Sequence, residues 1–227
     1  MNKIIQGIRR FQTEIYPKNR EFFKRLALGQ SPEALFICCS DSRISLDLIT
    51  QTAPGDLFVC RNAGNIVPVY GQGDAVSGTI EYAVSVVKVK HIVVCGHSDC
   101  GAMKGLLKRE TLGDMPAVQQ WLRHADAARC AFESENPDHS SPGTLADLAK
   151  MNVLLQLAHL ATHSCVFAKT RDGSLNLHGW YYQIETADVQ AWDPESEAWL
   201  PFENAPVISK IEPEFVKPDY NKLMQPA

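Results

Sequence analysis

The stretch His91-Ile-Val-Val-Cys-Gly-His97-Ser-Asp-Cys100-Gly-Ala-Met103 decides the fold. Its apolar run predicts a short strand from Ile92 to Cys95 that ends at Gly96. His97 and Cys100 follow three positions apart, a spacing that lets an imidazole and a thiolate bind one metal ion from a single turn. The sequence therefore predicts a strand that presents two metal ligands at its carboxyl end.

A second apolar run ends in the same way. Residues 34–38 predict a strand, which breaks into Cys39-Ser-Asp41-Ser-Arg43. Two parallel strands ending side by side would bring Cys39, His97 and Cys100 to the edge where open α/β sheets carry their sites. Three such ligands suit zinc, and an open fourth position is typical of a catalytic zinc.

Asp41 is the best fourth candidate ligand in the local sequence. It is close enough to Arg43 for a carboxylate–guanidinium pair, which would keep Asp41 ionised and away from the metal. Its free oxygen could then accept a hydrogen bond from a zinc-bound hydroxide. The alternative to a catalytic zinc is a structural zinc that joins the two loops. The alternative for Asp41 and Arg43 is a surface ion pair of little energetic value.

The remaining pattern predicts alternating strands and helices. A third strand (56–60) and a helix (76–87) precede the strand at 92–95, and such strand–helix–strand units imply parallel pairing. Further helices are expected at 102–108, 116–132 and 144–162, and a closing hairpin at 175–184 and 188–192. We expect an α/β fold: a mostly parallel central β-sheet flanked by helices, with an N-terminal helical arm and a C-terminal antiparallel edge hairpin.

The N-terminal segment predicts an amphipathic arm. Apolar residues recur every three to four positions over residues 2–28, with an interruption at Pro17. An arm this apolar needs a surface to lie on, either its own domain or a partner subunit. We expect residues 1–203 to form a single domain whose arm, residues 1–28, packs on a partner, and residues 204–227 to form a Pro-rich tail.

The composition limits the classes of protein to which the chain can belong. A chain of 227 residues and 25.2 kDa fits one large domain, and a net charge of −4 gives no sign of nucleic-acid binding. No apolar run approaches the roughly 20 residues that span a membrane, and no signal or transit peptide is evident, so we expect a cytoplasmic protein. The odd number of cysteines, seven, predicts metal ligands plus buried thiols in a reducing compartment, with Cys38, Cys60 and Cys95 in the core.

These residues carry a family resemblance. Cys39-Ser-Asp-Ser-Arg43 together with His97-Ser-Asp-Cys100-Gly resembles the β-class carbonic anhydrases, and most closely the bacterial cyanate-operon and the cyanobacterial plant-type members. The resemblance covers roughly residues 1–203. It extends to Gly29-Gln-Ser-Pro32, Arg61-Asn-Ala-Gly-Asn65, Ile80-Glu-Tyr-Ala83 and Leu177-His-Gly-Trp180.

The resemblance implies a lyase with one zinc ion per chain that hydrates carbon dioxide reversibly to bicarbonate and a proton, by attack of a zinc-bound hydroxide. It implies a homodimer or a dimer of dimers, without nucleic-acid or membrane partners. Cys39, His97 and Cys100 match the zinc ligands, and Asp41 with Arg43 matches the catalytic dyad.

The resemblance also implies a substrate pocket, part of which comes from the neighbouring subunit. Gln30, Phe58 and Tyr82 match residues of that pocket. Ala63 stands where plant-type enzymes usually have valine, which makes the apolar wall smaller. The backbone N–H of Gly101 could also face the substrate.

The sequence leaves two alternative functions and the role of two histidines open. A hydrolase of carbonyl sulfide or carbon disulfide on the same scaffold would have identical ligands. A non-catalytic, zinc-stabilised scaffold protein is a second alternative, although binding alone requires neither Asp41 nor Arg43. His91 and His178 are candidates for a proton shuttle or for structural histidines.

Overall fold

The computed structural model of the chain describes residues 1–136 and 144–204. The tail predicted for residues 204–227 therefore lies outside the described residues, except for Asn204. No helix in the described ranges is long and apolar enough to cross a membrane.

A six-stranded sheet forms the centre of the molecule, with the strand order β2-β1-β3-β4-β5-β6. The first four strands are parallel, and β5 and β6 continue the sheet in antiparallel fashion. The predicted mostly parallel sheet with an antiparallel C-terminal edge is confirmed. The strands are β1 (Ala34–Cys39), β2 (Leu57–Asn62), β3 (His91–His97), β4 (Asn176–Tyr182), β5 (Val189–Asp193) and β6 (Ala198–Pro201).

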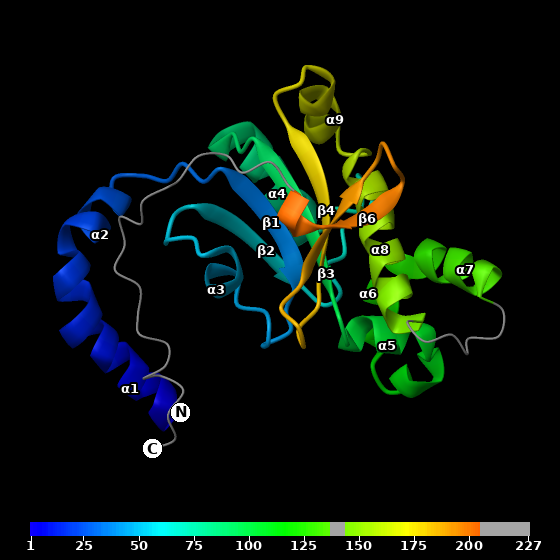
Figure 1. The fold of residues 1–227 in the computed structure, drawn as a ribbon, viewed down its shortest axis with the longest axis horizontal. Coiled ribbons are helices and arrows are strands. Elements are labelled where there is room, and N and C mark those ends of the chain that lie inside the picture. Colours follow the sequence, from blue (N-terminus) through cyan, green and yellow to red (C-terminus); the bar gives the residue numbers. More distant parts are fainter. Residues whose placement is uncertain (137–143, 205–227) are drawn as a thin grey trace.

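Helices surround this sheet (Figure 1). The α-helices are α1 (Asn2–Arg10), α2 (Arg20–Leu26), α3 (Leu46–Thr50), α4 (Ala75–Tyr82), α5 (Gly101–Leu107), α6 (Pro116–Leu122), α7 (Asp126–Glu135), α8 (Thr144–Leu160) and α9 (Ser164–Arg171). Short π or 3₁₀ segments are η1 (Phe11–Ile15), η2 (Tyr16–Asn19), η3 (Ala83–Val87), η4 (Arg109–Leu112), η5 (Arg123–Ala125) and η6 (Phe202–Asn204).

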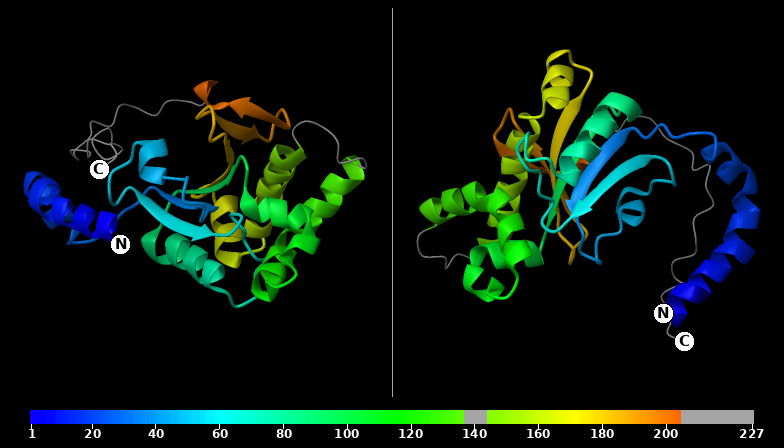
Figure 2. Two further views of the ribbon diagram at one scale, coloured as in Figure 1. Left: turned by 90° about the horizontal axis from the view of Figure 1, so that it is seen from below. Right: turned by 180° about the vertical axis from the view of Figure 1, so that it is seen from behind.

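The central strands β1 and β3 are buried on both faces, which explains why they read as continuous apolar runs. One face, with Leu35 and Ile37, packs against α4 and α8. The opposite face, with Phe36 and Cys38, packs against Leu46 of α3. Figure 2 shows α4 and α8 on one side of the sheet and α3 on the other.

The N-terminal arm extends away from the sheet (Figures 1 and 2). Its first helix, α1, buries none of its residues, and the apolar side chains Ile4, Ile8 and Phe11 are 61%, 55% and 41% exposed. Pro17 lies in η2, between the two helices of the arm, as the sequence predicts. The arm therefore presents an apolar surface to its surroundings in the single chain.

The structure differs from the sequence expectation in three places. The helix expected over 116–132 is divided by η5 into α6 and α7. The break contains neither Gly nor Pro, so packing of the buried Leu122 and Ala125, rather than local sequence, decides it. Helix α9 and the edge strand β6 are not predicted, because both are short and only weakly patterned.

Candidate metal centre

Cys39, His97 and Cys100 meet at the carboxyl edge of the parallel strands. Cys39 ends β1, His97 ends β3, and Cys100 is the N-cap residue of α5. Their ligand atoms all lie within 4.8 Å of one another, and all three residues are buried. The two thiol sulfurs are 3.9 Å apart. The juxtaposition predicted from two parallel strands is thus present, because the β1–β3 register places Cys38 beside Cys95 and both strands end together.

The imidazole of His97 is oriented for metal binding. Its Nδ1 lies 2.8 Å from the carbonyl oxygen of Ser98, so Nδ1–H donates there and the lone pair remains on Nε2. This Nε2 is buried and has no hydrogen-bond partner among the described residues. A buried imidazole nitrogen without a partner beside two thiols is a donor set that a borderline-soft divalent cation satisfies.

The two thiols share their protons unequally. Hydrogen bonds, chiefly from the Cys100 thiol, lower the pKa of the Cys39 thiol well below its usual value. The same contact, together with burial, raises the pKa of Cys100. A divalent cation would replace the shared proton and allow both thiols to ionise. These residues therefore fit the zinc ion that the sequence implies.

Asp41 is held beside the cluster by Arg43. The carboxylate accepts hydrogen bonds from Arg43 Nε (3.0 Å, to Oδ1), from Arg43 Nη2 (2.7 Å, to Oδ2) and from the Arg43 backbone N–H (3.0 Å). These bonds hold the pKa of the Asp41 carboxyl well below its usual range. Among the described residues, Asp41 is not part of the group whose ligand atoms lie within 4.8 Å of one another.

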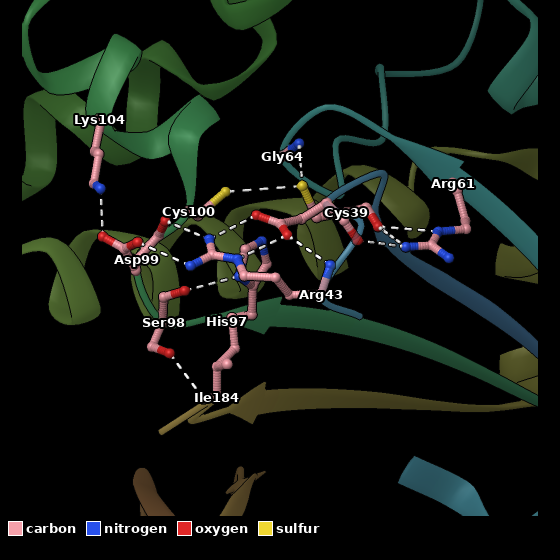
Figure 3. A network of polar contacts seen from close by, with 11 residues as sticks. Cys39, Arg43, Arg61, Gly64, His97, Ser98, Asp99, Cys100, Lys104 and Ile184 are labelled. Carbon is pink, nitrogen blue, oxygen red and sulfur yellow. Dashed lines mark hydrogen bonds and ion pairs between the residues drawn. The ribbon is translucent and has the colours of Figure 1, made fainter. Parts of the chain in front are cut away.

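A second aspartate, Asp99, also forms hydrogen bonds with the Arg43 guanidinium, a contact that the sequence did not predict. Arg43 Nη1 donates to Asp99 Oδ2 at 3.0 Å, and Nη2 donates to the Asp99 carbonyl at 3.2 Å. Lys104 forms an ion pair with the other oxygen of Asp99. Figure 3 shows Asp99 between Lys104 and Arg43, beside Cys100. Asp99 has a φ of 57°, a conformation that Asp and Asn tolerate better than most residues.

Arg61 fixes the loop that carries Cys39 and Asp41 (Figure 3). Its guanidinium donates to the Cys39 carbonyl at 3.0 and 3.2 Å and to the Asp41 carbonyl at 2.8 Å. Gly64 in the next loop donates its N–H to Cys39 Sγ at 3.4 Å. The sequence offered one signal for both contacts, the motif Arg61-Asn-Ala-Gly-Asn65, but no means of assigning their partners.

Two polar residues, Asn152 and Gln156, form a stripe on α8 that is hydrogen-bonded to the loop containing Gly64 and Val67. Asn152 donates to the Gly64 carbonyl at 3.0 Å, and Gln156 accepts from the Val67 N–H at 2.8 Å while donating to Asn152 at 2.9 Å. The helix can approach because β3 has Gly96 at the crossing, where an added Cβ would meet Val153 Cγ2 at 2.9 Å. The loop beside Cys39 is therefore fixed by buried hydrogen bonds.

The residues proposed to contact substrate divide into two groups. Gly101 follows the ligand Cys100, and Ala63 lies next to Gly64, with its carbonyl accepting from Trp121 Nε1 at 2.8 Å. In contrast, Phe58 pairs with Leu35, four residues before the Cys39–Asn62 pair, which is about 13 Å along the strand. Tyr82 stacks on Phe58, with ring centroids 6.0 Å apart, and Gln30 precedes β1 altogether.

The two histidines considered as proton shuttles lie near the amino-terminal ends of β3 and β4, away from the cluster. His91 begins β3 and His97 ends it, a separation of about 20 Å at the rise of a strand. His178 lies beside Val93 near the start of β4. Within one chain, neither imidazole can exchange a proton directly with the cluster.

The fold and the site together define the class: an α/β protein with a Cys–His–Cys metal-binding cluster at the carboxyl edge of its parallel strands and an Asp–Arg pair beside it. The family model described as carbonic anhydrase matches residues 34–189. The chain is 49% identical to a carbonic anhydrase of Pseudomonas aeruginosa over 93% of its own length and 96% of that protein.

Solved structures agree. The β-carbonic anhydrase CcaA superimposes with a TM-score of 0.85 at 41% identity, covering 88% of this chain and 98% of that one. A tetrameric β-carbonic anhydrase from Sordaria macrospora matches with a TM-score of 0.68 at 32% identity, covering 84% and 92%. This chain belongs to the β-carbonic anhydrase family, and its enzyme class is carbonic anhydrase.

Proposed function

We propose that this protein is a zinc enzyme that interconverts carbon dioxide and bicarbonate, with one zinc ion held by Cys39, His97 and Cys100. The observation that carries the proposal is the buried cluster of two thiols and a partnerless imidazole nitrogen in a chain of this family. Two thiolates and one imidazole suit zinc and leave one coordination position open. When bound, zinc lowers the pKa of a water molecule in that position and so supplies a nucleophile near neutral pH.

The Asp41–Arg43 pair orients the water molecule that attacks carbon dioxide. Because Arg43 holds the Asp41 carboxylate ionised and in one position, a remaining lone pair can accept a hydrogen bond from the attacking water. This fixes the direction in which the nucleophile presents its other lone pair to carbon dioxide. Arg43 also keeps Asp41 from becoming a fourth metal ligand. We therefore assign Asp41 a catalytic role and Arg43 the role of holding it.

Substrate binding requires a second subunit. Ala63 and Gly101 stand beside the cluster of their own chain, and we assign them to the substrate pocket. Gln30, Phe58 and Tyr82 lie at the opposite end of the strands, so they complete a pocket only at the cluster of a neighbouring copy. Tyr82 is 47% exposed, which leaves its ring available for such a contact.

We further propose that residues 1–203 form one domain whose arm, residues 1–28, packs on a partner in a homodimer or a dimer of dimers. The exposed apolar side chains of α1 support this, as does the tetrameric state of the Sordaria macrospora relative. All seven cysteines are free thiols, which supports a reducing compartment, and we place the enzyme in the cytoplasm.

A stopped-flow assay of carbon dioxide hydration tests the proposal. The purified protein should hydrate carbon dioxide, lose the activity when a strong chelator removes the metal, and regain it with Zn²⁺. Carbonyl sulfide and carbon disulfide should be assayed in parallel. Turnover of these sulfides without hydration of carbon dioxide would refute the proposal, as would hydration that survives complete removal of the metal.

A further inference from the structure

His91 and His178 face each other at the amino-terminal ends of β3 and β4. His91 Nδ1 and His178 Nε2 are 3.0 Å apart, and the ring centroids are 5.2 Å apart. The pair lies about 20 Å along β3 from the ligand His97. It is therefore separate from the metal-binding cluster of its own chain, and none of the roles proposed above uses it.

The pair opens into a cavity of about 720 Å³. Three carboxylates line this cavity with the two imidazoles, and its lining contains no Lys or Arg. Asp56 and Asp193 also accept hydrogen bonds from neighbouring turns. Glu33 is exposed, and its carboxylate makes no hydrogen bond or ion pair within the described residues. This distribution of charge favours a cation and disfavours an anion.

The spacing of the two ring nitrogens suits two ligands of one ion. Nitrogen ligands about 2.0–2.1 Å from a tetrahedral metal stand roughly 3.3 Å apart. The imidazoles must therefore break their hydrogen bond, separate by a few tenths of an ångström and turn so that both lone pairs point at one ion. An ion would replace the proton that the two nitrogens now share. Burial, together with the neighbouring His91, lowers the pKa of His178, so this ring is neutral at pH 7 and its lone pair can bind a metal.

We infer that His91 and His178 form a second metal site, which takes a divalent transition-metal ion of the Co²⁺, Ni²⁺ or Zn²⁺ type. Water molecules in the cavity complete the coordination, because the only group of three or more possible protein ligands among the described residues is that of Cys39, His97 and Cys100. Because the two ligands lie on neighbouring strands, the ion cross-links β3 to β4 at the end of the sheet opposite the catalytic centre. An ion that binds only the folded chain also raises its thermal stability.

Equilibrium dialysis of the zinc-loaded enzyme against CoCl₂ tests this inference. We expect one cobalt ion per chain in addition to the zinc, with a higher melting temperature. The thiolate-to-cobalt charge-transfer absorption in the near ultraviolet should be absent, because this site contains no sulfur. Cobalt that instead displaced zinc from the cysteines would show that absorption.

Three variants locate the ion. His91→Gln and His178→Gln should each weaken cobalt binding by at least about tenfold, the smallest loss expected when even an outer-shell partner is removed. Both variants should keep their zinc and their rate of carbon dioxide hydration. His124→Gln is the matched control, since this imidazole lies against Trp121, outside the cavity. The inference is overturned if the wild type retains no extra cobalt at millimolar concentrations, or if both histidine variants retain it undiminished.

Discussion

Arg43 binds both carboxylate oxygens of Asp41, through Nε at 3.0 Å and Nη2 at 2.7 Å, and so holds this acid beside the cluster of Cys39, His97 and Cys100. A surface ion pair contributes little to stability. This one is different because the Asp41 side chain is only 17% exposed and lies next to a metal-binding cluster. We therefore expect the pair to act by positioning the Asp41 carboxylate.

Asp41→Asn should retain zinc and lose activity. Loss of a well-placed acceptor in a catalytic site costs on the order of tenfold to a thousandfold in turnover. Metal analysis and stopped-flow hydration measure the two effects separately. A fully active Asp41→Asn enzyme would falsify the catalytic role, and loss of zinc in this variant would instead favour a four-ligand structural site.

Arg43→Ala should behave differently from Asp41→Asn. Without the guanidinium, the Asp41 carboxylate is free to take the open position on the metal. We expect an enzyme that is inactive near neutral pH and recovers as rising pH lets hydroxide compete for that position. Hydration rates from pH 6 to 9 and a crystal structure of the variant test this. Full activity near neutral pH, with Asp41 unmoved in the crystal, would contradict the prediction.

Asp99→Asn should weaken the interaction of residue 99 with Arg43 Nη1, because it removes the negative charge of the ion pair. Asn tolerates the positive φ of this position, so the backbone should not change. Because the ion pair is exposed to solvent, the expected fall in kcat/KM is modest, up to about fivefold. Lys104→Gln, which removes the outer partner of Asp99, serves as the control and should have a smaller effect. An unchanged kcat/KM in Asp99→Asn would exclude a positioning role for this carboxylate.

Cys39→Ser, His97→Ala and Cys100→Ser should each lose the metal, because two remaining ligands bind zinc far more weakly than three. Cys130→Ser is the control, since this thiol is exposed and outside the cluster. Elemental analysis after dialysis gives the result. About one zinc ion per chain in all three ligand variants would show that the ligands are wrongly assigned.

Deletion of residues 1–28 should give a poorly soluble and inactive protein, because the arm is proposed to pack on a partner that completes the pocket. Ile8→Lys is a milder test, since it places a charge on an apolar position of α1 that is 55% exposed. Gln6→Lys adds the same charge at a polar position and should have no effect. Light scattering that finds an active monomer in the deleted protein would contradict the proposed assembly.

Gln156→Leu should destabilise the fold. Gln156 is fully buried, and leucine would leave the Val67 N–H without its acceptor. An unsatisfied buried group costs about 1–3 kcal/mol. Gln120→Leu makes the same chemical change on an exposed position and should cost no more than about 0.5 kcal/mol. Urea unfolding of both variants measures the difference, and equal stabilities would show that the stripe on α8 contributes nothing.

The sequence alone determined the parallel sheet and the meeting of Cys39, His97 and Cys100. Both results rest on local rules: continuous apolar runs form buried strands, and parallel strands joined by helices end at the same edge. A ligand placed directly after each strand must therefore reach that edge. The buried state of Cys38, Cys60 and Cys95 followed from the same runs.

Only the tertiary structure decided which groups support the site. Asp99 lies 56 residues from Arg43 in sequence, and Gln156 lies 89 from Val67. It also placed Phe58 and Tyr82 away from the cluster of their own chain. Periodicity predicts which face of an element is buried, but many donors and acceptors in the chain are chemically equivalent. Strand register and helix packing select among them, because only the folded backbone brings one pair within hydrogen-bonding distance.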